Sequence, residues 1–393
     1  MTAIDVRTTA DAAIAAALST VEANIAAFGG LYPADTTAAN RYPVRPAGGG
    51  QPEGANVGWT TSFWPGMLWL AHDLTGDLAG DGKFRDAAMT HVDNFADRVS
   101  RGIDLDTHDL GFLYTLSCVQ VWRRTGDVKA RDAALAAADH LMSRFLEPAG
   151  IIQAWGDLHD PRQRGRTIID SLMNTPLLFW AGEITGDQRY AQAAVRHTIQ
   201  LRDNILRPDD STFHTFYWDP ETGEPLRGET EQGHADDSCW ARGQAWGIYG
   251  FALNHRYSGD PSFLEASTRC AEYFLAHLPS DRVPYWDLAF GDDDGESSGQ
   301  ERDSSAAAIA VCGLMELARA RPDDGFQDAA ARILGSLMDS YSTAGHPESN
   351  ALILHGVYDK PKNTGVDEGN LWGDYFYLEA LTRATRPEWA APW

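Results

Sequence analysis

Two aspartates are the first residues whose type and position could do chemistry. Asp109 follows His108 at the start of one apolar helical run, and Asp170 follows two isoleucines at the start of another. Two carboxyl groups at the mouth of one pocket suit acid/base work on a sugar, because one can hold a proton while the other is ionised. The apolar flank of Asp170 would raise its pKa, which suits a proton donor. Aspartate is also a preferred helix N-cap, so a capping role stays open for both residues.

A second polar cluster leads into a later apolar helical run. His214 and Gln232 stand in the long loop before this run, and Arg242 lies one turn inside it. A buried guanidinium needs an anionic partner. Arg242 therefore predicts either a contact with an anionic substrate or an ion pair with Asp236 or Asp237, and both interpretations stay open.

Tryptophan is abundant near these polar segments. Flat indole rings stack on sugar rings, and the six that fall on or beside the polar segments are Trp64, Trp155, Trp218, Trp240, Trp246 and Trp372. Core packing is the alternative, and we expect it for Trp69, Trp122 and Trp180. The chain shows no metal-ligand spacing and no phosphate-loop, GxGxxG or GxSxG motif, so the sequence predicts neither a metal nor a cofactor.

Repeated helical hairpins must position these residues. An apolar helical run ends at a short turn, and an amphipathic, alanine-rich run follows. Glycine ends the first helix in the left-handed conformation and aspartate caps the second, at Thr75-Gly76-Asp77, Thr125-Gly126-Asp127, Thr185-Gly186-Asp187 and Ser258-Gly259-Asp260, with a variant at 321–324. The apolar runs are 63–74, 111–122, 172–184, 240–257, 306–318 and 372–385, and the amphipathic runs are 9–28, 84–99, 130–145, 190–205, 263–278 and 326–341.

Six runs of each kind predict an all-α fold, an (α/α)6 barrel of six inner and six outer helices. Hairpins that each expose an apolar face must stack, and a closed ring is one solution. No proline- or serine-rich linker divides the chain, so we expect residues 1–393 to form a single catalytic domain. The long connections all run from outer to inner helices, which places them on one face. Converging helix N-termini there could hold an anion.

The composition and charge limit the classes of molecule that the protein is expected to bind. A formal net charge of -24 over 393 residues repels phosphates and anionic membranes, so we expect no nucleic acid or membrane partner. No apolar run of about 20 residues and no signal peptide is evident, which predicts a cytoplasmic protein. The four cysteines lack paired spacing and are expected to be buried thiols. We expect a monomer or a homodimer.

The segments that carry these residues resemble glycoside hydrolase family 88, the unsaturated glucuronyl hydrolases. The most specific segment is DDSCWARGQAWGIYGF at residues 236–251. Four others agree in the same order: WTTSFWPG (59–66), HDLGF (108–112), DSSAAAIA (303–310) and WGDYFYLEA (372–380). The resemblance spans nearly the whole chain, and it implies the same (α/α)6 barrel.

The resemblance also implies an activity. Members of this family act on oligosaccharides left by polysaccharide lyases, and they hydrate the C4=C5 double bond of the terminal unsaturated uronic acid. The hemiketal that forms then opens and releases the sugar. Asp170 matches the general acid/base of the family, and Asp109 matches the second essential aspartate. The implied substrate-binding residues are His108, His214, Gln232, Arg242, Trp246, Trp64 and Trp155.

Other functions stay open. The related unsaturated rhamnogalacturonyl hydrolases share the fold and the aspartate pair but release a different sugar. A direct inverting glycosidase or a sugar epimerase could use the same barrel. A non-catalytic oligosaccharide-binding protein would need only the tryptophans, with the aspartates as caps. The parent polysaccharide is not predicted, although Lys360 and Lys362 lie in a loop that could bind a sulfate.

Overall fold

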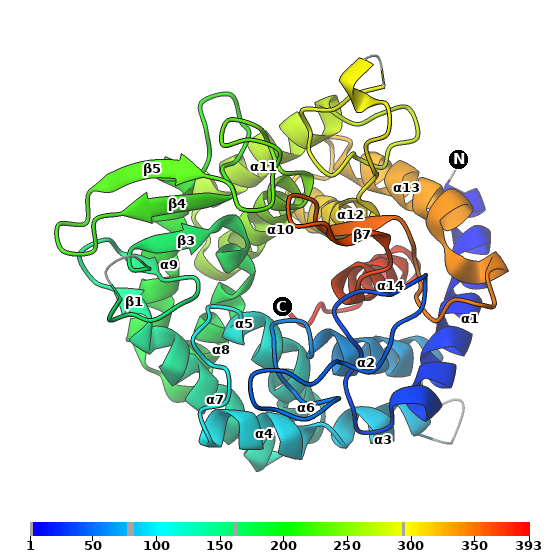
Figure 1. Cartoon of the computed structure of the whole chain (residues 1–393), viewed down its shortest axis with the longest axis horizontal. Helices are drawn as coiled ribbons and strands as arrows, with labels where there is room; N and C mark the ends of the chain where they lie inside the picture. The colour runs from blue at the N-terminus through cyan, green and yellow to red at the C-terminus, as the bar shows by residue number, and fades with distance from the viewer. Residues whose placement is uncertain (1–2, 77–81, 161–162, 293–294) are drawn as a thin grey trace.

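The computed structural model describes residues 3–76, 82–160, 163–292 and 295–393, which form a ring of helices (Figure 1). Within these ranges the inner helices are α2 (Phe63–Thr75), α5 (Leu110–Tyr114) continued by η2 (Thr115–Val119) and α6 (Gln120–Thr125), α8 (Thr175–Thr185), α10 (Ala241–Ser258), α12 (Ser304–Ala320) and α14 (Leu371–Thr385). The outer helices are α1 (Ala3–Phe28), α3 (Lys83–Met89) with α4 (Val92–Ser100), α7 (Val128–Ser143), α9 (Gln188–Asn204), α11 (Pro261–Ala276) and α13 (Phe326–Ser336), which η5 (Leu337–Tyr341) continues. Because α14 packs on both α12 and α2, the ring closes, and the predicted (α/α)6 barrel is confirmed.

The short turns between inner and outer helices have the predicted chemistry. Gly126, Gly186 and Gly259 are left-handed, with φ between 71° and 75°. The aspartate after each glycine accepts a hydrogen bond from a backbone N–H in the first turn of the next helix. Asp77 of the first predicted turn lies outside the described residues.

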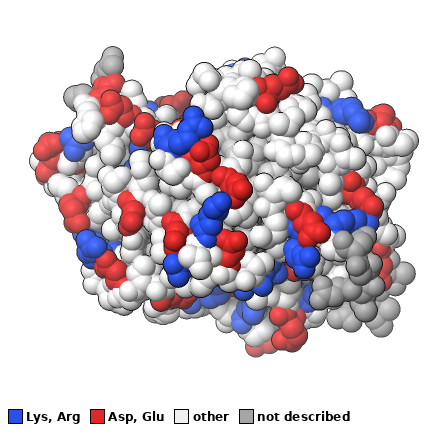
Figure 2. Space-filling model, turned by 90° about the horizontal axis from the view of Figure 1, so that it is seen from below, with Lys and Arg blue, Asp and Glu red and all other residues white. Residues whose placement is uncertain are grey.

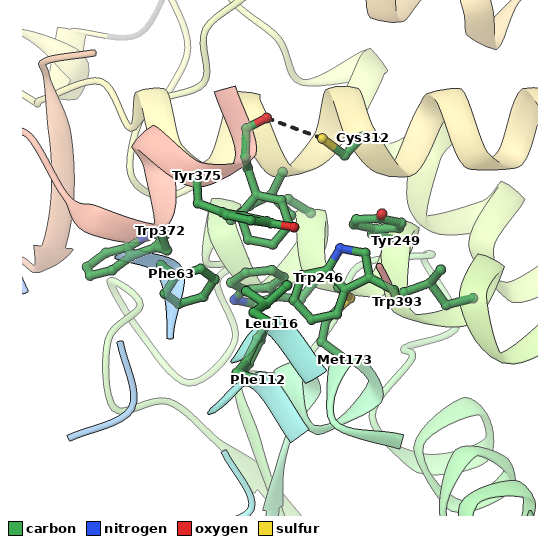
Figure 3. Packing of buried hydrophobic residues seen from close by; sticks show 14 of the residues in the cluster. Phe63, Phe112, Leu116, Met173, Trp246, Tyr249, Cys312, Trp372, Tyr375 and Trp393 are labelled. Carbon is green, nitrogen blue, oxygen red and sulfur yellow. Dashed lines mark hydrogen bonds between the residues drawn. The ribbon is translucent and has the colours of Figure 1, made fainter. Parts of the chain in front are cut away.

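Aromatic side chains fill the centre of the barrel (Figure 3). Phe376 stacks on Trp393 with ring centroids 5.8 Å apart and lies edge-on to Trp246 at 5.3 Å. Phe112 contacts both of these tryptophans. Figure 1 accordingly shows the C-terminus inside the ring. The four cysteines are buried and unpaired, as predicted.

The long connections contain short strands, which the all-helical prediction did not include. β1 (Phe145–Leu146) pairs with β2 (Ile151–Ile152), β3 (Arg166–Ile168) with β4 (Thr215–Trp218), β4 with β5 (Pro225–Glu229), and β6 (Gly356–Asp359) with β7 (Thr364–Glu368). All these pairs are antiparallel. Strands of two to five residues are too short for an alternating pattern to stand out in a polar loop.

One outer helix corrects an expectation about apolar runs. Residues Ala10–Phe28 of α1 are the one described stretch long and apolar enough to cross a membrane, with a mean hydropathy of 1.2. In the structure Ala10, Ala13, Ala17 and Val21 are buried at helical spacing, and α1 packs on α14. Alanine, which fits close helix packing, supplies much of the hydropathy of this stretch.

Charged side chains of both signs are interspersed on the side of the barrel shown in Figure 2. Ion pairs also join outer helices: the charged atoms of Lys129 in α7 and Asp93 in α4 lie 2.8 Å apart. The face in that view therefore shows no continuous basic surface of the kind that binds nucleic acid.

Candidate active site

A cavity of about 430 Å³ opens where the inner helices begin. The long connections converge on it, as the asymmetry of the loops predicted. Its lining residues are Trp59, His108, Asp109, Trp155, Arg166, Ile168, Asp170, His214, Glu231, Gln232, Trp240, Arg242, Trp246, Tyr358 and Lys362.

Two carboxyl groups and an imidazole meet in this cavity. Asp109 immediately precedes α5, and Asp170 lies in the short 3-10 helix η3 (Ile169–Met173). The Nε2 atom of His108 lies 3.4 Å from Oδ1 of Asp109 and 3.4 Å from Oδ1 of Asp170. His108 is buried, and burial lowers its pKa to about 3, so the imidazole is neutral at neutral pH.

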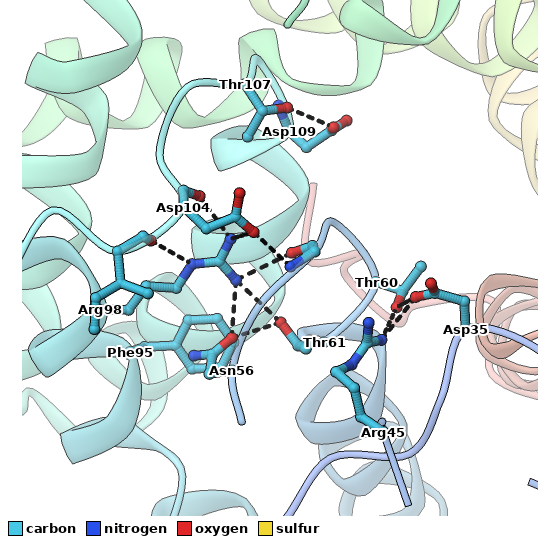
Figure 4. A network of polar contacts seen from close by, with 12 residues as sticks. Asp35, Arg45, Asn56, Thr60, Thr61, Phe95, Arg98, Asp104, Thr107 and Asp109 are labelled. Carbon is cyan, nitrogen blue, oxygen red and sulfur yellow. Dashed lines mark hydrogen bonds and ion pairs between the residues drawn. The ribbon is translucent and has the colours of Figure 1, made fainter. Parts of the chain in front are cut away.

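A buried arginine anchors the loop that precedes Asp109 by hydrogen bonds to the loop backbone (Figure 4). Arg98 of α4 donates hydrogen bonds to the backbone carbonyls of Ile103 and Asp104. At the end of the same loop the hydroxyl of Thr107 donates to Oδ2 of Asp109 at 2.6 Å. The orientation of the Asp109 carboxylate therefore depends on a loop that is anchored to an outer helix.

Neither aspartate acts as a side-chain cap, which was the alternative to an acid/base role. The Asp109 carboxylate accepts from Thr107 and makes no capping hydrogen bond to α5. Asp170 lies inside η3, whose N-cap is Ile168. Its Oδ1 atom is buried and has no hydrogen-bond partner among the described residues. A buried carboxyl oxygen without a donor favours the protonated form.

Burial raises the pKa values of both carboxyl groups, and the pair holds one proton more tightly than the other. Burial raises the pKa of Asp109 to about 6, against the opposing effect of the hydrogen bond from Thr107. Burial, and next the negative charge of Asp109, raise the pKa of Asp170 well above its usual value. Two close carboxyl groups cannot both ionise easily, so Asp109 ionises first and Asp170 keeps its proton.

The guanidinium of Arg242 is buried and bonded within the protein. Its Nη1 atom donates to Oδ2 of Asp303 at 2.9 Å and to the carbonyl oxygen of Val357. Its Nη2 atom donates to Oε1 of Gln232 at 3.0 Å and to the carbonyl oxygen of Tyr358 at 2.6 Å. Arg242 thus ties α10 to the start of α12 and to strand β6.

The ion-pair partners predicted for Arg242 were wrong. Asp236 and Asp237 are exposed in the turn before α10. Asp303 instead receives the guanidinium, and its other carboxylate oxygen caps α12 by accepting from backbone N–H groups. Neighbouring inner helices begin side by side in the ring, so Asp303 is close in space although 61 residues away in the sequence.

The predicted sugar-binding residues do not all reach the cavity. His108, His214, Gln232, Arg242, Trp155 and Trp246 line it. Trp64 does not, and its predicted stacking role was wrong: it is 1% exposed and packs edge-on against Phe28 of α1. Trp59, five residues earlier, lines the cavity instead and donates its indole N–H to the hydroxyl of Tyr358 at 3.0 Å.

Several lining residues were not singled out from the sequence. Arg166 lies over the ring of Trp155 at 4.1 Å and faces the cavity together with Ile168. Residues two apart on a strand share a face, so the run from Arg166 to Ile168 could have indicated this. Lys362, which the sequence placed in a loop that could bind a sulfate, also lines the cavity. Its Nζ atom lies 3.9 Å from a carboxylate oxygen of Glu231, and no local sequence signal brings those two residues together.

Three side chains of the cavity could together hold a metal ion. Each of His108, Asp109 and Asp170 offers one ligand atom, and these atoms all lie within 4.8 Å of one another. Metal binding would require both carboxyl groups to be deprotonated, which burial opposes. The absence of a metal requirement stays a prediction. We expect activity to survive dialysis against a chelator, and a loss that is restored by one added divalent cation would contradict this.

Comparison with known proteins agrees with this geometry. The family model of Glycosyl Hydrolase Family 88 matches residues 40–385. The unsaturated chondroitin disaccharide hydrolase of Streptococcus agalactiae serotype III (strain NEM316) is 46% identical over 386 residues, which cover 97% of this chain and 92% of that protein.

Solved structures agree as well. That of unsaturated glucuronyl hydrolase from Streptococcus agalactiae has a TM-score of 0.90 at 45% identity and covers 100% of this chain and 94% of its own. A mutant of that enzyme complexed with dGlcA-GalNAc6S has a TM-score of 0.82 at 42% identity, with the same coverage. The family model, the sequence match and the shared fold extend over nearly the whole length, and they show that the chain belongs to glycoside hydrolase family 88.

Proposed function

We propose that this family 88 enzyme releases the terminal 4,5-unsaturated uronic acid from lyase-generated acidic oligosaccharides by hydrating the C4=C5 double bond. The observation that carries the proposal is the pair of Asp170 and Asp109 in one cavity, with unequal tendencies to ionise. Protonation of an enol-ether carbon needs a general acid that still holds its proton at neutral pH, and Asp170 meets that need.

In the proposed reaction Asp170 donates its proton to C4, and positive charge develops at C5 and the ring oxygen. The Asp109 carboxylate stabilises that charge and orients the ring. Asp170, now ionised, accepts a proton from a water molecule whose oxygen bonds to C5. The net change is the addition of one water across the double bond, and the resulting hemiketal opens to release the neighbouring sugar.

The rest of the cavity suits an anionic sugar. His108 and His214 are both neutral, because burial lowers each pKa to about 3, and can serve as hydrogen-bonding groups. Arg166 makes no ion pair with any described residue, so its charge is available to a substrate. The amino end of α10 adds a partial positive charge.

We also propose partners and a location, as expected from the sequence. The net charge of -24 supports an enzyme that binds neither nucleic acid nor membranes. We propose a cytoplasmic location, where short lyase products would be the substrates, and a monomer or homodimer. The related rhamnogalacturonyl activity is the nearest alternative, since it would use the same aspartate pair.

Unsaturated disaccharides absorb ultraviolet light through the conjugated double bond, which gives a direct test. The purified protein would be incubated with a panel of lyase-generated disaccharides from several polysaccharides, both sulfated and unsulfated. Loss of absorbance with release of the intact neighbouring sugar is expected for at least one of them. A folded protein that leaves every member unchanged would refute the proposal, and the best substrate would identify the parent polysaccharide.

The activity should have a bell-shaped dependence on pH. The proposed reaction needs Asp109 ionised, so kcat/KM is expected to fall as the pH drops through about 6, where that carboxylate takes up a proton. It also needs Asp170 protonated, so kcat/KM is expected to fall again as the pH rises through the raised pKa of Asp170. The profile would be measured by absorbance at substrate concentrations well below KM, and a flat profile from pH 4 to pH 9 would contradict these roles.

Trp59 and Trp64 offer a matched pair of variants from one segment. Replacing Trp59 with alanine removes an aromatic face from the cavity and is expected to raise KM about 2- to 10-fold, the equivalent of one stacking interaction. Replacing Trp64 with phenylalanine is expected to lower the melting temperature and leave KM unchanged, because that ring lies in the core. Equal effects of the two variants on KM would contradict the assignment of Trp59 to the substrate cavity and of Trp64 to the core.

A further inference from the structure

One buried asparagine joins the two segments that carry the proposed catalytic carboxyl groups. Asn174 is fully buried where η3 ends and α8 begins. Its Oδ1 atom accepts a hydrogen bond from the backbone N–H of Phe112 at 2.7 Å, in the first turn after Asp109. Its Nδ2 atom lies 3.4 Å from the backbone carbonyl oxygen of Asp170, to which it donates. The side chain therefore spans the gap between the two main-chain segments.

The same two segments touch backbone to backbone. A Cβ atom at Gly111 would lie 2.1 Å from Cα of Asn174 and 2.4 Å from its carbonyl oxygen. Carbon atoms in ordinary contact lie about 3.5 to 4.0 Å apart, so only glycine permits this approach. Gly111 is two residues after Asp109, and Asn174 is four residues after Asp170. The contact thus sets how closely the two carboxyl-bearing turns can approach.

We propose that Asn174 is a positioning residue that fixes the separation of Asp109 from Asp170, with Gly111 making the close approach possible. This inference rests on the proposed function of the two carboxyl groups. Asn174 is not among the residues that line the cavity, so it acts through the segments it joins and not through the substrate. Repulsion between two carboxylates weakens as they separate, so a looser connection also makes Asp170 easier to ionise.

Replacing Asn174 with alanine tests the connection. We expect kcat to fall 10- to 100-fold with KM changed less than about 3-fold, because a displacement of about 1 Å at a catalytic group has effects of that size. The alkaline limb of the pH profile should move to lower pH, because the charge of Asp109 then acts less strongly on Asp170. Serine at position 174, which keeps a short hydrogen-bonding group, should restore part of kcat and part of the shift.

Asn350 provides the control for a purely structural effect. It is also buried, and its Oδ1 atom accepts from the backbone N–H of Tyr42 at 2.6 Å, but no hydrogen bond joins it to either carboxyl-bearing segment. Asn350→Ala should lower the melting temperature and leave kcat and the pH profile unchanged. If Asn174→Ala does not fold, Gly111→Ala tests the same separation, since the added methyl group must push the segments apart, and the same fall in kcat and the same shift are expected.

Three results would overturn the inference. Folded variants at position 174 with wild-type kcat and an unmoved alkaline limb would show that Asn174 does not position the pair. A fall in kcat without any shift of that limb would assign it a structural role only, as would an equal shift in Asn350→Ala. A wild-type protein that is inactive on every unsaturated disaccharide would instead refute the proposed function.

Discussion

Replacing Asp170 with asparagine is expected to lower kcat about 10²- to 10⁴-fold while the protein remains folded. The change keeps the shape of the side chain and removes the only proton that the reaction can transfer to C4, and general acid catalysis contributes rate factors of this size. It also removes a buried acid whose Oδ1 atom has no hydrogen-bond partner among the described residues. The melting temperature should therefore be unchanged or raised.

The asparagine variant separates catalysis from binding. Its affinity for an unsaturated disaccharide, measured by calorimetry, should stay close to the KM of the wild-type protein, because the cavity keeps its lining. Asp109→Asn should also lose most of its turnover, and its alkaline limb should move to lower pH, since it removes the charge that helps to hold the proton on Asp170. Normal turnover by Asp170→Asn would leave a sugar-binding protein as the better description.

Replacing Arg242 with methionine should destabilise the fold strongly. The variant leaves the fully buried Asp303 without its cation, and breaking one side of a buried ion pair costs about 3 to 5 kcal/mol of unfolding free energy. The carbonyl oxygens of Val357 and Tyr358 also lose their donor, so the hairpin of β6 and β7 should loosen over the cavity. Denaturant unfolding measures the first effect, and a raised KM reports the second.

A second replacement distinguishes a lost ion pair from lost packing. In the double variant Arg242→Met with Asp303→Asn no buried charge is left unpaired, and the amide oxygen at position 303 can still cap α12, so part of the lost stability should return while KM stays raised. The exposed pair of Lys129 and Asp93 is the control, and Lys129→Met should leave the denaturation midpoint unchanged. A single Arg242→Met variant as stable as the wild-type protein would contradict the buried pair.

Local sequence patterns predicted the features that depend on nearby residues. Helical periodicity located the inner and outer helices. The left-handed conformation of Gly126, Gly186 and Gly259 could be predicted because a glycine followed by aspartate between two helices commonly ends the first helix and caps the second. The two aspartates could be predicted to meet because both precede inner helices. The ring brings those helix starts together.

Features that depend on which face of a helix turns inward could not be predicted. Trp59 and Trp64 are five residues apart, and only the packing of α2 against α1 decides that Trp64 enters the core. Arg242 was assigned to nearby acids because sequence distance was the only available guide, whereas closure of the ring brings Asp303 to it. No sequence signal indicated the hydrogen bonds by which Asn174 joins the two carboxyl-bearing segments, since a buried asparagine and an exposed one look alike in a sequence.

Ring closure by α14 also limits when the protein can fold during its synthesis. The side chain of Asn24 bonds to the carbonyl oxygen of Asn350, 326 residues later, and Tyr42 bonds to Asp374, 332 residues later. At about 5 to 20 residues per second, the ribosome needs roughly 20 to 80 s to deliver all 393 residues. Until α14 emerges, α1 and α2 expose the apolar faces that α14 covers in the closed ring. Chaperones that shield such surfaces would therefore have their main effect on yield before translation ends.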